Sequence, residues 1–199
     1  MKIILPIFNI LAFFSCFSFY HLKAQNMLDT DKTFRNGRNG EVSCKKGSAF
    51  NTNDKGLILS GTIVKSDTFY NGKNAPVYCL QNHPVAFNEL GDILLATLLD
   101  NQTFYNGKNN AVYCLKGKQV EFYDSGKVKS AYLSSNQSFL NGNKVSVACE
   151  SHRKLILYEN GTVQTCTLSS NQTFYNNHKQ PRIFKKGEMV YFYEDGHVD

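Results

Sequence analysis

The chain has 199 residues, of which 42% are hydrophobic and 19% are charged, with 22 Lys and Arg against 16 Asp and Glu. The 15 Phe and 11 Tyr residues exclude a disordered chain, and a net charge of +6 is too mild for this length to indicate a nucleic-acid partner. The length allows one domain, or at most two small ones, with a buried core.

Residues 1–24 have the order of features of a secretory signal peptide. Lys2 supplies a positive charge, Ile3–Tyr20 is almost entirely apolar, and the small residue Ala24 ends the segment. Two alternatives stay open: an uncleaved membrane anchor, since the apolar run is near the lower limit for a bilayer span, and a lipoprotein attached through Cys16. Cleavage would remove two lysines and one cysteine, which leaves a net charge of +4 and five cysteines.

We therefore expect an exported bacterial protein, located in the periplasm, at the outer surface or outside the cell. Contact with a membrane is expected only through this N-terminal segment, if it is uncleaved or lipidated.

After a short lead of residues 25–32, one unit of 35 residues is repeated about five times over residues 33–199. The motif Thr-Phe-Tyr-Asn-Gly, or a close variant, starts at residues 33, 68, 103, 138 and 173. Cysteines and glycines keep the same step at Cys44, Cys79, Cys114 and Cys149 and at Gly56, Gly91, Gly126, Gly161 and Gly196, with Phe184 in the fifth cysteine place. Three markers with one period predict a repeat architecture.

The local sequence indicates β-hairpins. In residues 120–133 two short alternating runs flank Asp124-Ser125-Gly126, and in residues 104–114 two further runs flank Asn106-Gly107. Asn-Gly suits such a turn because both residues tolerate a positive φ, and the periodicity of an amphipathic helix is missing. We predict an all-β fold of tandem β-hairpin repeats stacked as an elongated antiparallel meander, with a β-solenoid as the alternative.

Alternation along the strands predicts which side chains form the core. The predicted core residues are Phe34, Phe69, Phe104, Phe139 and Phe174, together with Cys44, Cys79, Cys114 and Cys149. Equivalent cysteines would lie about 4.8 Å apart in a solenoid, within disulfide reach, but roughly 19 Å apart in a meander of four strands per repeat. We expect buried free thiols that act as small apolar side chains, and the pairing of the cysteines stays open.

Tyrosines recur at positions that alternate with this core or precede the turns: Tyr70, Tyr78, Tyr105, Tyr113, Tyr123, Tyr158, Tyr175 and Tyr193. One interpretation is half-buried cross-strand packing, for which tyrosine is well suited. The other is a ladder of flat, amphipathic rings that binds a glycan or an extended peptide. These eight residues are the candidate ligand face, and the partner that they predict is a protein or glycan of unknown identity.

The sequence predicts no catalytic, metal-binding or cofactor-binding residue. The five His residues fall out of register with one another, and the hydrolase, zinc-protease and phosphate-loop motifs are missing. A cysteine spacing of 35 residues is unlike that of zinc ligands. The glycosylation-type sequences at Asn101, Asn136 and Asn171 are interpreted as turn and strand-start residues.

The segment Phe122-Tyr123-Asp124-Ser125-Gly126-Lys127-Val128 resembles the aromatic-x-x-Gly-x-apolar kernel of MORN-type repeats, and residues 157–163 and 192–198 resemble it too. The resemblance covers about a third of each repeat, and the period here is longer than in that family. It implies stacked hairpins and a scaffold or membrane-proximal role without a fixed chemistry. We expect an exported, non-catalytic binding or structural scaffold of the bacterial cell envelope or exterior. The alternatives are an exported enzyme such as a glycan hydrolase and a toxin-immunity-like partner protein.

Overall fold

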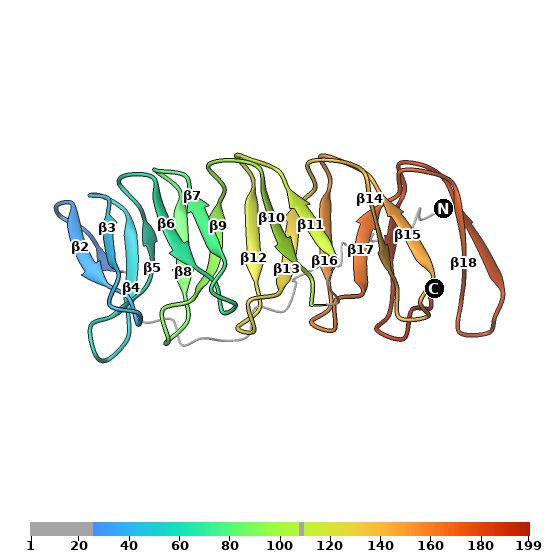
Figure 1. Cartoon of the computed structure of the whole chain (residues 1–199), viewed down its shortest axis with the longest axis horizontal. Helices are drawn as coiled ribbons and strands as arrows, with labels where there is room; N and C mark the ends of the chain where they lie inside the picture. Colours follow the sequence, from blue (N-terminus) through green and yellow to red (C-terminus); the bar gives the residue numbers. More distant parts are fainter. Residues whose placement is uncertain (1–25, 108–109) are drawn as a thin grey trace, which may run out of the picture.

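The computed structural model describes residues 26–107 and 110–199, and in these residues the regular elements are twenty short β-strands. Figure 1 shows the strands running across the long axis of the molecule, with the chain advancing along that axis from blue to red. The strands are β1 (Asn26–Met27), β2 (Lys32–Arg35), β3 (Glu41–Cys44), β4 (Ala49–Thr52), β5 (Ile58–Thr62), β6 (Asp67–Tyr70), β7 (Pro76–Cys79), β8 (Pro84–Phe87), β9 (Ile93–Thr97), β10 (Gln102–Tyr105), β11 (Ala111–Cys114), β12 (Gln119–Phe122), β13 (Val128–Tyr132), β14 (Gln137–Leu140), β15 (Ser146–Cys149), β16 (Lys154–Leu157), β17 (Val163–Thr167), β18 (Gln172–Tyr175), β19 (Pro181–Phe184) and β20 (Met189–Tyr191). The predicted all-β, elongated, antiparallel arrangement is confirmed.

The strands form two layers. Ten of them make one meandering sheet in the order β1-β4-β5-β8-β9-β12-β13-β16-β17-β20. The other ten make five separate two-stranded hairpins, β2–β3, β6–β7, β10–β11, β14–β15 and β18–β19, which we call the hairpin layer. Single bridges such as Cys79 with Leu98 join the end of a hairpin to the sheet. Each full repeat therefore contributes two strands to the sheet and one hairpin to the layer above it.

Because the four strands of a repeat are divided between two layers, equivalent residues of neighbouring repeats lie closer together than one continuous sheet would place them. The value of roughly 19 Å between equivalent cysteines is wrong, because it placed all four strands of a repeat in one sheet. One repeat advances the sheet by only two strands, which is about 10 Å. Equivalent cysteines thus still lie beyond the reach of about 7 Å that a disulfide allows.

The core lies between the two layers. The predicted core residues Phe34, Phe69, Phe104, Phe139, Phe174, Cys44, Cys79, Cys114 and Cys149 are all buried there. A hairpin phenylalanine meets a sheet phenylalanine edge to face in three repeats: Phe69 with Phe87 at 5.0 Å, Phe104 with Phe122 at 4.9 Å, and Phe174 with Phe192 at 4.8 Å between ring centroids. Such pairs add to the stabilisation that burial alone provides.

A buried asparagine joins each of the first four hairpins to the next repeat. The side-chain N–H of Asn71 donates to the carbonyl of Gly126 at 3.1 Å, while its Oδ1 accepts from the backbone N–H of Lys73 and Ala75 at 3.0 Å each. The same donation runs from Asn36 to Gly91, from Asn106 to Gly161 and from Asn141 to Gly196. In the last hairpin Asn176 donates instead to the side chain of its neighbour Gln180. We call the Asn71-type contact the turn lock.

The glycine after three of these asparagines is required by close contact with backbone of the next repeat, whereas Gly107 has a φ of 91° and faces only the Lys127 side chain. A Cβ on Gly37 would lie 2.4 Å from the carbonyl oxygen of Glu89, and one on Gly142 would lie 2.2 Å from that of Glu194. Positive φ values instead fall two positions later, at Asn39, Asn74, Lys144 and Lys179. Tolerance of a positive φ therefore does not account for the Asn-Gly pairs at 36–37, 71–72 and 141–142. In the fifth copy the exposed Asn177 stands in place of the glycine. Among the described residues no turn of a later repeat packs against it, so a side chain fits there.

Candidate functional site

Five of the eight candidate tyrosines lie on the outer surface of the hairpin layer. Strand alternation turns each hairpin phenylalanine toward the sheet and the next residue toward solvent. The exposed fractions are 46% for Tyr70, 42% for Tyr78, 54% for Tyr105, 46% for Tyr113 and 55% for Tyr175. Rings in neighbouring repeats are separated by one repeat advance, about 10 Å. We call this surface the outer hairpin face.

The central part of the outer hairpin face carries no charge on its outward positions. Across β6–β7, β10–β11 and β14–β15 these positions are Thr68, Tyr70, Pro76, Tyr78, Thr103, Tyr105, Ala111, Tyr113, Ser138, Leu140, Ser146 and Ala148. Tyr78 lies directly across from Thr68, and Tyr113 lies across from Thr103. Each of these rings therefore has a hydroxyl beside it, within cross-strand distance. Aromatic faces and neutral hydroxyls suit an uncharged ligand.

The structure places the other three candidate tyrosines elsewhere. Tyr123 and Tyr158 are half-buried beside turns of the sheet, and their hydroxyls donate to the carbonyls of Leu157 and Phe192, each at 2.9 Å. Burial raises the pKa of both hydroxyls above the ordinary value of tyrosine. The Tyr193 hydroxyl donates to the Asp199 carboxylate at 3.1 Å, and this bond raises the Tyr193 pKa. These three rings tie turns together and do not share the outer hairpin face.

Glutamine side chains bridge the gap between neighbouring hairpins, and sequence reasoning missed them. Gln102, in the first position of β10, accepts from the backbone N–H of Tyr78 at 2.9 Å and donates to the carbonyl of Pro76 at 3.3 Å. Gln137 makes the same pair of bonds to Tyr113 and Ala111, and Gln172 makes them to Ala148 and Ser146. A primary carboxamide can do this because it carries both an acceptor and a donor. We call this arrangement the glutamine bridge.

The first junction, between β2–β3 and β6–β7, has no glutamine bridge. Asp67 stands in the equivalent position, and its carboxylate accepts from the N–H of the next residue, Thr68, at 2.8 Å. A cavity of about 260 Å³ lies at this junction. It is lined by Asn36, Arg38, Gly40, Glu41, Asp67, Thr68, Phe69 and Tyr70.

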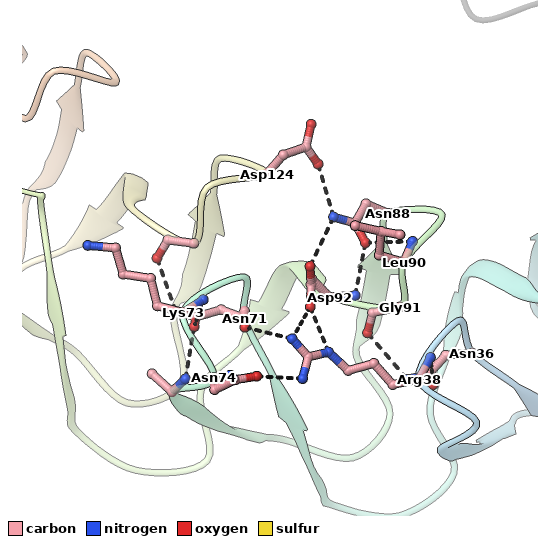
Figure 2. Close-up of polar contacts among 12 residues, drawn as sticks. Asn36, Arg38, Asn71, Lys73, Asn74, Asn88, Leu90, Gly91, Asp92 and Asp124 are labelled. Carbon is pink, nitrogen blue, oxygen red and sulfur yellow. Dashed lines mark hydrogen bonds and ion pairs between the residues drawn. The ribbon is translucent and has the colours of Figure 1, made fainter.

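An arginine cluster secures this junction instead. Figure 2 shows the Arg38 guanidinium, which comes from the turn of the first hairpin, beside Asp92 and Asn74. Its Nε donates to the Asp92 carboxylate at 2.6 Å, and its Nη1 donates to the Asn74 side chain at 2.6 Å. Asn88 donates to the same carboxylate at 3.3 Å, so the buried Asp92 is charge-paired and hydrogen-bonded. Removing one partner of such a pair is strongly destabilising, which marks this cluster as structural.

The cysteines have the character of core residues. Cys44, Cys79, Cys114, Cys149 and Cys166 are buried free thiols. Burial raises the pKa of Cys44 to about 11 and the pKa values of Cys79 and Cys114 to about 12. The pKa of Cys149 is raised as well, first through its hydrogen bond with Cys166 and then through burial. Since the thiolate is the reactive form, the four thiols with a raised pKa are unreactive near neutral pH.

The raised thiol pKa values predict how stability depends on pH. The folded state holds its thiol protons to higher pH than the unfolded state, so the stabilisation is complete below about pH 9 and is lost as pH rises toward the folded pKa. We expect each such thiol to lower the free energy of unfolding by about 1.4 kcal/mol per pH unit over that range.

Denaturant unfolding of the wild type and of Cys114→Ala between about pH 8 and 11 measures this dependence. The difference in free energy between the two proteins should narrow as pH rises, because only the wild type loses the contribution of this thiol. A difference that stays constant over the range would contradict the prediction.

Comparison of the sequence with protein-family models and with curated proteins finds no match. The resemblance to MORN-type repeats therefore stays a prediction. The predicted signal peptide lies outside the described residues. Residues 26–107 and 110–199 include no helix long and apolar enough to span a bilayer and no group of three or more His, Cys, Asp and Glu that could hold a metal.

Proposed function

We propose that this protein is an exported, non-catalytic scaffold of the bacterial cell envelope or exterior that binds an uncharged polysaccharide along its outer hairpin face. The observation that carries the proposal is the row of half-exposed rings Tyr70, Tyr78, Tyr105, Tyr113 and Tyr175. The resemblance to MORN-type arrays agrees with a scaffold role.

The geometry of the face favours a glycan as the ligand. A sugar ring offers an apolar face for stacking on tyrosine and hydroxyls for hydrogen bonds to neighbouring polar groups. The face provides both, because Thr68 and Thr103 lie across from Tyr78 and Tyr113. A long chain can contact rings from several repeats at once, so weak contacts add along the array. The uncharged outward positions at the centre of this face disfavour a strongly charged protein partner.

Cosedimentation with insoluble chitin and cellulose tests the proposal. The chain has no Trp, so its intrinsic fluorescence comes from its 11 tyrosines, five of which lie on this face. We expect the wild type to bind at least one of the two polymers, and the double variant Tyr105→Ser/Tyr113→Ser to bind about 10-fold more weakly, equivalent to about 1.4 kcal/mol.

Tyr191→Ser is the matched control. Tyr191 is 47% exposed in β20 and alternates with the buried Val190, so it faces away from the hairpin layer. Its replacement should leave binding unchanged. Absence of wild-type binding to both polymers, or equal binding by the double variant, would refute the proposal.

A further inference from the structure

The first junction lacks a group that the three following junctions have. At those junctions a glutamine carboxamide satisfies one backbone N–H and one backbone carbonyl on the edge of the preceding hairpin. The equivalent groups at the first junction are the N–H of Ser43 and the carbonyl of Glu41, one repeat before Tyr78 and Pro76. Among the described residues neither of these two groups has a hydrogen-bond partner.

Asp67 cannot take the place of the missing glutamine. Its side chain is one carbon shorter, and an ionised carboxylate accepts hydrogen bonds but donates none. Its oxygen is also engaged with the N–H of Thr68 at 2.8 Å. The junction therefore keeps an unfilled donor and acceptor pair on β3, where Glu41 lines the cavity of about 260 Å³ and Ser43 lies two residues further along the strand.

We propose that this cavity is a binding slot for a primary carboxamide, presented by a glutamine or asparagine side chain of a partner polypeptide. The ligand oxygen accepts from the Ser43 N–H, and the ligand NH₂ donates to the Glu41 carbonyl, as Gln102 does at the next junction. The slot shares only Thr68 and Tyr70 with the polysaccharide face, and it does not depend on the proposed function.

The charges around the slot select against an acidic ligand. The acidic residues Glu41 and Asp67 line the cavity, while the Arg38 guanidinium is already paired with Asp92. A carboxylate offers no donor to the Glu41 carbonyl, so a glutamate side chain would leave that carbonyl unsatisfied. An ammonium group offers no acceptor to the Ser43 N–H, so a lysine side chain would leave that donor unsatisfied.

Amide hydrogen exchange tests the slot without any ligand. In the wild type we expect the Ser43 amide to exchange faster than the amides of Tyr78, Tyr113 and Ala148, which are hydrogen-bonded to glutamine. Asp67→Gln should slow exchange at Ser43 by about 10-fold or more, because the introduced carboxamide fills the slot. Asp67→Asn is the matched control, since it removes the charge but is too short to reach, and it should leave exchange fast. No slowing in Asp67→Gln would overturn the proposal.

Ligand binding is tested by NMR on the ¹⁵N-labelled mature chain with the capped tripeptides Ser-Gln-Ser, Ser-Glu-Ser and Ser-Lys-Ser. Only the glutamine peptide should shift the Ser43 amide signal saturably, and Asp67→Gln should weaken this binding about 10-fold or more. Asp67→Asn should retain it. The variant Gln102→Asp should open a second slot, so that the Tyr78 amide responds to the same peptide. No response to the glutamine peptide, or a stronger response to the lysine or glutamate peptide, would overturn the carboxamide assignment.

Discussion

Replacing Gly72 with alanine is expected to lower the free energy of unfolding by about 1–3 kcal/mol, the usual range for overpacking. The added Cβ would lie 2.3 Å from the carbonyl oxygen of Asp124 and 2.9 Å from the backbone nitrogen of Gly126. Both contacts are with backbone of the neighbouring repeat, so no side-chain rotation relieves them. The hairpin β6–β7 must move away from the sheet turn, and the turn lock from Asn71 to Gly126 is weakened as a result.

Asn177→Ala is the matched control for this prediction, because Asn177 holds the same place in the fifth repeat and is exposed. A surface substitution of this kind should change the free energy of unfolding by less than about 0.5 kcal/mol. Denaturant unfolding monitored by far-UV circular dichroism measures both variants. Similar small effects for Gly72→Ala and Asn177→Ala would show that the turn packing does not limit stability.

Phe104→Ala should lower the free energy of unfolding by about 3–5 kcal/mol, the usual range for emptying a buried phenylalanine site. Phe104 is 2% exposed and meets Phe122 edge to face across the two layers. The variant loses the buried area and the ring pair, and it leaves a cavity between a hairpin and the sheet.

Tyr105→Ala provides the comparison within the same strand. Tyr105 is the next residue along β10, but its ring is 54% exposed on the outer hairpin face. Its removal should lower the free energy of unfolding by less than about 1 kcal/mol, mostly through lost cross-strand contact. If both variants were equally destabilised, the division of this strand into a core face and a solvent face would be wrong.

The sequence predicted the repeat, the hairpins and the parity of the strands, because each rests on a local pattern with a fixed period. It did not predict that the Asn-Gly hairpins leave the sheet and form a second layer. Both hairpins of a repeat have one apolar face, as Phe104 and Phe122 illustrate. Alternation shows that such faces are buried but does not show which strand edges form hydrogen bonds across repeats, so one continuous sheet and two packed layers gave the same pattern.

The candidate site was predicted only in part for a related reason. Alternation correctly identified outward positions such as Tyr105, which follow a buried phenylalanine in a strand. It could not assign Tyr123 or Tyr158, because a residue beside a turn takes its direction from the turn and from the next repeat. Gln102 was overlooked since its bonds reach backbone groups 24 and 26 residues earlier, and backbone groups leave no trace in the sequence. The sequence did carry one signal for these bridges, because the same place in the repeat holds glutamine at 102, 137 and 172 but Asp67 in the earlier copy.

The turn lock makes the array of repeats directional, although the repeats themselves follow one regular period. Each locked hairpin is secured by the repeat that follows it, since every donor points to a carbonyl 55 residues later in the chain. During synthesis the turn lock of a hairpin can form only after the next repeat has left the ribosome. Each hairpin therefore completes its folding one repeat later than its own synthesis. The last hairpin, with Ile183 78% exposed, has no such fastening in this structure. Unfolding under heat or force should therefore start at β18–β19 and proceed hairpin by hairpin toward the N-terminus.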